Sequence, residues 1–332
     1  MTVISETLVP DIFFLPEWGQ AYASQDHGQV EVFELKNEYG HIFYQFVVRP
    51  IPFKLNGIQY FDTITPFGTG GPIILNCQPG KRSRLTALFD EEFQKFCSEC
   101  QIITEYIRFN PWLKNKDDFN ETYSFDKRGI TMYIDLTVND YFKDEFESKA
   151  RQQVRRAQKN EIELEYDYTG ATLSEFSRIY DIMAKRNNIP SYYMFSEEFL
   201  KNSFRFLEGK QFIIHAKHEG RYISTAFFLH QGDYLHYHLA ANDPEYFHLA
   251  ANSLILDEAC RWGVKHQKKE LHLGGASSEP LSRFKKRFTK TDPLDIITGK
   301  KVRDSEIYNQ LIRARKEQGD IEDLSYFPLY RA

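Results

Sequence analysis

Long apolar runs are absent from this sequence. The longest, such as Phe43 to Val48 and Tyr222 to Leu229, have the length of a strand and fall far short of the roughly 20 residues that span a bilayer. The N-terminal stretch MTVISETLVPDIFFLPEW lacks a basic start and a small-residue cleavage site, and it carries Glu6 and Asp11. It therefore does not resemble a secretory signal. We expect no membrane span and a cytoplasmic location.

Cysteine and net charge are also low. Four cysteines in 332 residues do not form a disulfide framework, which agrees with a reducing compartment. The net charge is -5, so the whole protein has no general attraction for nucleic acid or anionic membranes. Local basic segments at 149–159, 283–290 and 300–316 are the places where anions can bind.

Aromatic residues are abundant, with 28 Phe and 20 Tyr in a chain that is 42% hydrophobic and 27% charged. This composition is typical of a globular protein. A chain of 332 residues exceeds one ordinary hydrophobic core, so we expect two domains of roughly 150 residues each.

The first half of the chain predicts mixed α/β structure. Two alternating runs between Val30 and Val48, joined at Asn37 to Gly40, predict a β-hairpin. Apolar residues spaced by three and four between Arg82 and Cys100 predict an amphipathic helix. We expect strands at 102–109 and 130–136.

The second half opens with a charged segment that predicts one helix over 140–160, and we place a domain boundary there, giving domains 1–139 and 140–332. A strand at 162–168 and helices at 172–187 and 196–207 follow. Three strands, 211–217, 222–230 and 233–241, are separated by short Gly-bearing turns and predict an antiparallel meander. A helix at 252–266 and the strand ELHLGG complete the unit.

Two helices, an antiparallel meander, a helix and a further strand form an order that resembles a GNAT acyltransferase domain. More specific segments are YFDTITPFGTGGP (60–72), RFNPW (108–112), MYIDL (132–136), SKARQQVRRAQKNEIEL (148–164), the run from Leu235 to Gly275, and LSRFKKRF (281–288). They resemble the Fem family of peptidoglycan-bridge aminoacyltransferases and related GNAT-like proteins of cell-envelope and polysaccharide synthesis. One departure is Glu161, where the family usually has glycine.

The resemblance implies an α/β (α+β) fold of tandem GNAT-like domains, each a mixed, mostly antiparallel sheet flanked by helices. It implies an acyltransferase that moves an acyl or aminoacyl group from acyl-CoA or aminoacyl-tRNA to an amine of a small or lipid-linked envelope precursor. Either donor acts as a co-substrate, and no tightly bound cofactor is expected. An acetyl-CoA-dependent N-acetyltransferase acting on an amino sugar and a catalytically silent binding protein are the alternatives.

The donor site implied by the resemblance lies at the start of a helix, whose first amides bind a pyrophosphate in CoA-dependent relatives. The aligned residues run from Phe247 to Asn252 and lack the usual basic residue and both glycines. Alanine disfavours the positive φ that glycine accepts, which weakens the CoA interpretation. A loop that only caps a core helix is the structural alternative. The expected donor-binding residues are Ala250, Ala251 and Asn252, with backbone groups of Ala240, Ala241 and Asn242 as oxyanion donors.

The expected catalytic residues are Lys285 and His238. Lys285 aligns with the lysine of the family's Phe-Lys motif, with Phe284 as its partner, and its ammonium can hold a phosphate or a developing negative charge. We assign Lys290 to a solvated basic face. A neutral histidine suits a general base near pH 7, although a hydrogen-bonded structural histidine is the commoner case for a residue such as His238. His236 and His272 are the histidines that could share a metal with it across neighbouring strands, but the family gives no support for a metal and we expect none.

Acceptor-binding candidates are spread along the chain. Arg151 and Arg155 lie one helical turn apart and suit a phosphate, or else a surface helix. Tyr192 and Tyr193 suit a cleft wall or a core. The remaining candidates, which lie in the glycine-rich turn of the first half, are Asp62, Gly70 and Gly71, where a carboxylate could accept from an amine or simply organise the turn. The oligomeric state is left open.

Overall fold

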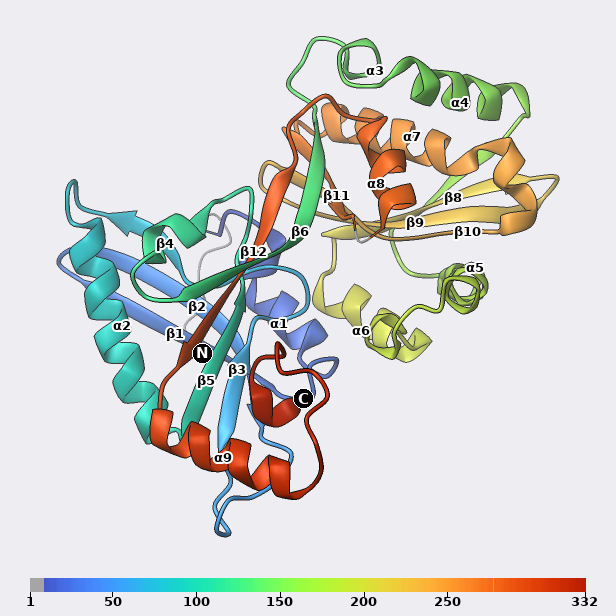
Figure 1. Ribbon diagram of the computed structural model, residues 1–332. Coiled ribbons are helices and arrows are strands. Elements are labelled where there is room, and N and C mark those ends of the chain that lie inside the picture. The colour runs from blue at the N-terminus through green and yellow to red at the C-terminus, as the bar shows by residue number, and fades with distance from the viewer. Residues whose placement is uncertain (1–8, 277) are drawn as a thin grey trace. The chain divides into compact units, whose positions relative to one another are not determined.

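The computed structural model describes residues 9–276 and 278–332 and divides into two compact units (Figure 1). Residues 1–8, at the start of the N-terminal stretch MTVISETLVPDIFFLPEW, lie outside the described residues, as does residue 277. The first unit contains residues 13–128 and 295–332, and the second contains 10–12 and 129–294. No helix in the described ranges is long and apolar enough to cross a membrane.

The first unit is a mixed sheet covered by helices. Its strands are β1 (Gln29–Asn37), β2 (Gly40–Pro50), β3 (Phe61–Ile64), β4 (Ile73–Cys77), β5 (Ile102–Arg108), the start of β6 (Ser124–Asp135) and β12 (Leu294–Val302). They follow the order β1-β2-β3-β5-β12-β6, with β4 paired to β2. Its helices are α1 (Pro16–Tyr22), α2 (Arg82–Glu99) and α9 (Ser305–Glu317), with short 3-10 turns at Ile12–Phe14, Asn115–Phe119 and Leu329–Arg331. The predicted hairpin is confirmed, since Asn37 lies opposite Gly40.

A buried aromatic and ionic core holds this unit together. Phe89 and Phe93 of α2 pack on β2. Beneath them the guanidinium of Arg303 on the chain following β12 pairs with the buried carboxylate of Glu105 on β5. Such a pair needs full hydrogen bonding to offset desolvation, and Asp90 supplies a second acceptor for Arg303 at 2.7 Å. The last segment of the chain is thereby tied to β5.

The second unit contains a sheet with the order β6-β11-β10-β9-β8-β7. Its strands beyond β6 are β7 (Glu163–Asp167), β8 (Gln211–His218), β9 (Arg221–Gln231), β10 (Tyr234–Asn242) and β11 (Glu270–Gly275). Strands β8, β9 and β10 form the predicted antiparallel meander, and β10 runs parallel to β11. Together with the first unit this confirms the expected fold class.

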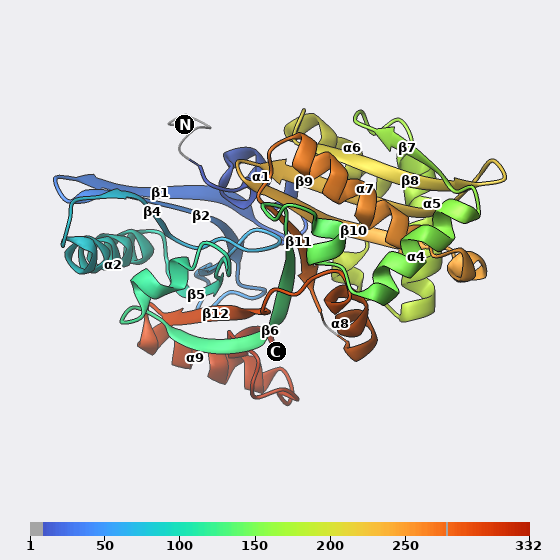
Figure 2. The same cartoon turned by 90° about the horizontal axis from the view of Figure 1, so that it is seen from above.

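Helices cover both faces of the second sheet. α7 (Ala251–Lys265) lies on one face, and α5 (Leu173–Asn187) and α6 (Glu197–Phe206) lie on the other (Figure 1). α4 (Ser148–Lys159) runs alongside α7, as the view from above shows (Figure 2), and both contribute to one buried core. α8 (Glu279–Lys286) follows β11, and 3-10 turns η4 (Ser191–Tyr193) and η5 (Pro244–Leu249) precede α6 and α7.

The prediction of one continuous helix over 140–160 is wrong, because the helix is broken in two. The structure has a short helix α3 (Tyr141–Asp144), a break, and then α4. At the break Phe146 turns into the core against Phe288, and the buried carboxylate of Glu145 accepts hydrogen bonds from Thr289 at 2.8 Å and from the Lys290 amide at 3.2 Å. These tertiary contacts outweigh the local helical preference.

The compact units differ from the predicted domain ranges in two respects. The chain leaves the first unit at Arg128, within β6, and residues 295–332 return to that unit because β12 pairs with β5. Compact units are not by themselves independently folding domains, so the division into domains 1–139 and 140–332 stays a prediction.

Candidate active site

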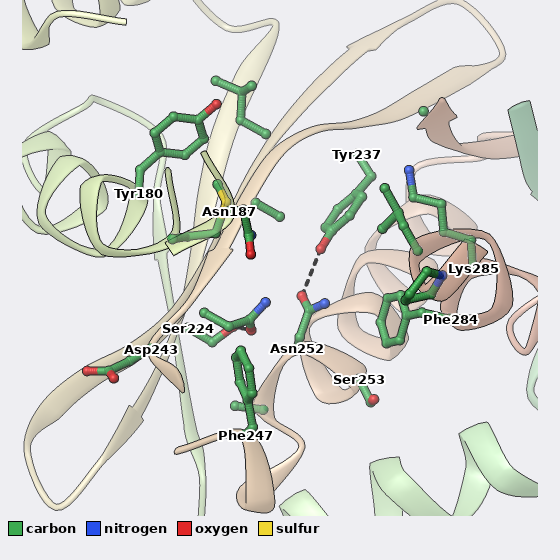
Figure 3. A pocket seen from close by; sticks show the side chains of 18 of the residues that line it. Tyr180, Asn187, Ser224, Tyr237, Asp243, Phe247, Asn252, Ser253, Phe284 and Lys285 are labelled. Atoms are coloured by element: carbon green, nitrogen blue, oxygen red, sulfur yellow. Dashed lines mark hydrogen bonds between the residues drawn. The ribbon is translucent and has the colours of Figure 1, made fainter. Parts of the chain in front are cut away.

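A pocket of about 1000 Å³ lies in the second unit (Figure 3). Its walls come from α5, β10, η5, the first turn of α7, the end of β11 and α8. It gathers side chains that are separated by more than a hundred positions, from Gln153 to Lys285. The pocket therefore depends on the whole second unit rather than on one motif.

The pocket forms where β10 and β11 separate. Within the described residues the two strands pair at three positions, from Tyr234 opposite Glu270 to His236 opposite His272. The register of β10 against β9 then shifts between Tyr237 and Leu239, which makes His238 a bulge. Four successive β10 residues, 237–240, line the pocket. The opening reaches both faces of the sheet, because α5 and α7 lie on opposite faces and both line the pocket.

Lys285 lies at the inner wall of this opening. Its side chain is 5% exposed, and its Nζ donates to the Gly275 carbonyl oxygen at 2.7 Å. Burial without a carboxylate partner lowers the pKa of Lys285 to about 8. The ammonium is therefore mostly charged at neutral pH and held by one backbone carbonyl, so it retains donors for a ligand.

Helix α8 fixes this lysine. Ser278 precedes the helix and its hydroxyl accepts from the Leu281 amide at 3.4 Å, as an N-cap does. The rings of Phe284 and Phe288 make a tilted contact at 5.1 Å between centroids, with Phe288 fully buried and Phe284 lining the pocket. Lys290 lies outside the pocket lining, and its Nζ lies 3.4 Å from the Lys143 carbonyl oxygen.

Gly274 keeps the space beside the ammonium open. Its φ is +72°, and a methyl group placed on it would lie 3.6 Å from the Tyr237 carbonyl oxygen and 3.7 Å from Lys285 Nζ. A side chain would therefore fill the gap between the two separated strands. The glycine belonged to a quoted motif, but its role could not be read from the sequence because it depends on β10 lying opposite.

His238 lines the pocket at the bulge. Burial, followed by the nearby His236, lowers the pKa of His238 to about 3. The imidazole is thus neutral at physiological pH, as a base must be, but its low pKa makes it a weak proton acceptor. His236 instead places its Nε2 3.1 Å from Asp11, and its ring stacks on His272 at 5.3 Å.

Helix α7 presents its first turn to the pocket. Ala250 precedes it in the left-handed conformation, with φ +59° and ψ +30°. Alanine there costs about 1 kcal/mol relative to glycine, so the loop keeps the shape of a glycine turn without its glycines. Ala250, Ala251 and Asn252 all line the pocket. The helix begins one residue before the predicted start, and Asn252 is not its N-cap.

Asn252 is held by a residue that the sequence analysis did not single out. The buried Tyr237 hydroxyl donates to Asn252 Oδ1 at 2.8 Å (Figure 3). This contact fixes the amide so that Nδ2 is directed away from the tyrosine. A period-two strand places Tyr237 opposite the histidine face, which is the one signal that could have found it.

Arg186 is a second residue that the sequence analysis missed. It lies in the last turn of α5 and lines the pocket, with its guanidinium carbon 4.7 Å from the centre of the Phe247 ring. Phe247 occupies the position where the motif usually has a basic residue. The structure brings a cation to that place from another helix, which no motif in one stretch of sequence could reveal.

Several predicted site residues lie away from the pocket lining. Arg151 donates to the Phe146 carbonyl oxygen, and Arg155 lies 5.8 Å from the Phe142 ring centre. Tyr193 provides a backbone acceptor for the pocket residue Tyr180 at 2.9 Å. Tyr192 is adjacent to it. Ala241 is fully buried in the strand, whereas its neighbours Ala240 and Asn242 line the pocket.

The candidates of the glycine-rich turn belong to the first unit. Asp62 is fully buried, and its carboxylate accepts from Arg49 at 2.9 Å, from Arg331 and from the Tyr330 hydroxyl. Gly71 has a φ of +86°, and a methyl group there would lie 2.8 Å from Ile107. Gly70 donates its amide to the Arg108 carbonyl at 2.8 Å. These contacts give the turn a packing role. Among the described residues no group of three or more potential ligands is placed to bind a metal.

Comparisons with known proteins agree with this geometry. Residues 146–286 match the model of the acetyltransferase (GNAT) domain. The chain is 26% identical over 233 residues to the UDP-N-acetylmuramoylpentapeptide-lysine N(6)-alanyltransferase of Weissella viridescens, covering 62% of this chain and 68% of that protein.

Solved structures show the same fold. The crystal structure of FemX superposes with a TM-score of 0.71 at 13% identity, covering 93% of this chain and 98% of that one. A tandem GNAT protein from the clavulanic acid pathway gives a TM-score of 0.51 at 10% identity over 84% of each chain. Fold, pocket and family model together define an acyltransferase of the GNAT class. Within that class the chain resembles the Fem-type proteins.

Proposed function

We propose that this protein transfers an aminoacyl or acyl group from an activated donor to a primary amine of a cell-envelope precursor, in the cytoplasm. The observation that carries the proposal is the buried Lys285 ammonium beside the opening between β10 and β11. A buried cation with one backbone acceptor is costly to keep, and an anionic transition state beside it would use that charge.

The reaction proceeds by attack of the neutral amine on the donor carbonyl carbon. A C–N bond forms, the carbonyl oxygen becomes an oxyanion, and the ester or thioester bond to the leaving group then breaks. Lys285 and the backbone amides of Ala240 and Asn242, where β10 has left β11, stabilise the oxyanion. The proton lost by the amine is taken up by the leaving oxygen or sulfur. We propose that His238 carries this proton to the leaving group, although its pKa of about 3 makes it a weak base.

The donor is proposed to enter over the first turn of α7. Its orphan amides and the helix dipole favour an anion, and Arg186 adds the cation that the loop itself lacks. The name of the alanyltransferase relative favours an alanyl donor, and the resemblance to Fem proteins makes aminoacyl-tRNA the first candidate. The left-handed conformation of Ala250 favours the second candidate, acyl-CoA, because it is the backbone conformation that a glycine of a phosphate-binding loop adopts readily.

The acceptor is proposed to reach the split from the α5 face of the sheet, where Tyr180 and Asn187 line the pocket. The relative's name refers to a UDP-linked muramoyl pentapeptide and its lysine, so a lysine-type amine on a nucleotide-linked or lipid-linked peptide is the proposed acceptor. Phe284 contributes an apolar contact at the pocket wall. We propose structural roles for Asp62, Gly70 and Gly71, and no direct acceptor contact for Arg151, Arg155, Tyr192 and Tyr193.

The test compares Lys285→Ala with Lys290→Ala, a matched change in the same basic segment at a lysine that lies outside the pocket lining. Purified variants are supplied with alanyl-tRNA and a UDP-linked muramoyl pentapeptide, or with acetyl-CoA and an amino sugar. We expect transfer that Lys285→Ala lowers at least about 100-fold, as removal of an oxyanion donor does, and that Lys290→Ala leaves unchanged. Equal rates in both variants would contradict the proposal, and the active substrate pair identifies the donor.

A further inference from the structure

The rim of the pocket carries an exposed aromatic ring that the transfer chemistry does not use. Phe247, in the turn η5 before α7, is 49% exposed, although burying such a ring is worth about 2 kcal/mol. Its ring is directed into the pocket (Figure 3). An exposed phenylalanine inside a pocket is a surface that a ligand can cover.

A guanidinium faces this ring. Arg186 lies with its guanidinium carbon 4.7 Å from the ring centre, within the range of a cation–π contact. The two side chains come from α5 and η5, on different segments of the chain. An aromatic ring and a guanidinium placed together suit a flat, electron-rich ligand such as a nucleobase.

The segment that holds Phe247 is firmly built. The buried Asp243 carboxylate accepts from the Glu245 amide at 3.1 Å and pairs with Arg221 at 3.1 Å. The guanidinium of Arg221 also lies 5.4 Å from the ring centre of Tyr246. The Phe247 carbonyl oxygen accepts from the Ala250 amide at 3.2 Å, which ties the ring to the first turn of α7. The ring therefore has a fixed position relative to the helix start.

The charge of the pocket is complementary to a phosphate. Arg186, Asp243 and Lys285 are the lining residues with formal charges. Asp243 is neutralised by Arg221, so the remaining charges, on Arg186 and Lys285, are positive. A nucleoside phosphate carries a flat base and an anion one ribose apart. The pocket offers the Phe247 ring for the base, and the Arg186 guanidinium with the first turn of α7 for the anion.

We propose that Phe247 and Arg186 form a nucleotide subsite that stacks the adenine of the acyl donor. This inference deepens the proposed function and rests on it for the identity of the ligand as donor. Adenosine is common to the 3′ end of a charged RNA and to CoA, so the subsite serves either source.

The test is a calorimetric titration of the full chain with adenosine 5′-monophosphate, ribose 5-phosphate and uridine 5′-monophosphate. We expect adenosine monophosphate to bind about tenfold more tightly than ribose phosphate, as stacking on one aromatic ring provides. Phe247→Ala should remove that difference and Phe247→Tyr should keep it. Arg186→Ala should weaken binding of adenosine monophosphate.

The matched control is a second arginine–phenylalanine pair, Arg205 over Phe206 at 5.1 Å, which lies on α6 outside the pocket. Phe206→Ala should leave binding unchanged. Equal binding of adenosine and ribose phosphates, tighter binding of the uridine compound, or an effect of Phe206→Ala as large as that of Phe247→Ala would overturn the subsite.

Two further arms separate the ligand sources and the proposed function. Competition by CoA, or by a short RNA hairpin with a 3′-terminal adenosine, against adenosine monophosphate identifies which donor uses the site. Lys285→Ala should retain adenosine monophosphate binding while losing transfer. Binding that depends on Phe247 without any transfer would support the subsite and contradict the proposed reaction. Transfer that Phe247→Ala leaves unaffected would support the reaction and contradict the subsite.

Discussion

At Lys285 the residue type could be interpreted from the sequence, whereas its burial and its hydrogen bond could not. Its type and its place in the Phe-Lys motif predicted a functional cation. The sequence could not indicate that the ammonium would be 5% exposed and bonded to the Gly275 carbonyl, because these features depend on β11 and α8 folding together. Burial is also what turns a basic surface residue into a strong electrostatic group.

Lys285→Met should abolish transfer and stabilise the protein at once. A buried ammonium with a lowered pKa penalises folding, and the shift from 10.5 to about 8 corresponds to about 1–3 kcal/mol after the lost hydrogen bond is allowed for. The unfolded chain binds more protons between these two values, so the penalty is complete below pH 8 and fades as pH rises toward 10.5. Urea unfolding at pH 7 and pH 10 measures it. A variant that is less stable than wild type at pH 7 would contradict this account.

Gly274→Ala should reduce transfer by about tenfold or more, because its methyl group occupies the space beside Lys285 Nζ. Gly209→Ala is the control, since Gly209 has a similar φ of +70° but an added methyl group would meet nothing within 4 Å. Both variants should lose about 1 kcal/mol of stability from left-handed strain. If both also lose activity equally, Gly274 has no role at the site.

At the scale of elements, the sequence predicted most helices and strands because their apolar periodicity agrees with their burial. It failed where tertiary contacts prevail. The break before α4 depends on Phe146 and Glu145 meeting residues near Phe288. The turn at Ala250 adopts a left-handed conformation that alanine disfavours. Arg186 was missed because α5 and η5 approach each other only in the folded chain.

The contact between β10 and α7 gives a prediction at this scale. Tyr237→Phe removes the hydroxyl that orients Asn252 in the first turn of α7. One such hydrogen bond contributes about 1 kcal/mol, so kcat/KM for the donor should fall roughly fivefold, mainly through a raised KM. Tyr166→Phe is the control, because the Tyr166 hydroxyl donates to Glu258 on the same helix at 2.9 Å, outside the pocket. Steady-state kinetics measure both variants. Equal values of kcat/KM for the two would show that the hydrogen bond from Tyr237 to Asn252 does not affect donor binding.

At the scale of the whole molecule, the sequence indicated two parts and their fold class but not their connectivity. Residues 295–332 return to the first unit because β12 pairs with β5 and Tyr330 is buried beside Asp62. Pairing between strands almost two hundred residues apart leaves no local pattern to detect. The same distant contacts tie Asp62 to Tyr330 and Arg331, which agrees with the organising role that was one of its two predicted roles.

Asp62→Ala should therefore destabilise the protein by about 3 kcal/mol, since it leaves Arg49 and Arg331 unpaired in a largely enclosed site. Asp126→Ala breaks the partly exposed pair with Lys300 in the same unit and should cost less than about 1 kcal/mol. Thermal unfolding compares them. A stable Asp62→Ala variant with impaired acceptor binding would instead support the other predicted role, in which this carboxylate accepts a hydrogen bond from the acceptor amine.

The central claim, acyl transfer at the split between β10 and β11 with Lys285 as its cation, is tested most directly by single-turnover transfer. Labelled alanyl-tRNA and a UDP-linked muramoyl pentapeptide are mixed with excess wild type or Lys285→Met, after circular dichroism confirms that both are folded. The account predicts a new amide on the acceptor with wild type and at least about a 100-fold slower reaction with the variant. Transfer at the same rate in both proteins would contradict it.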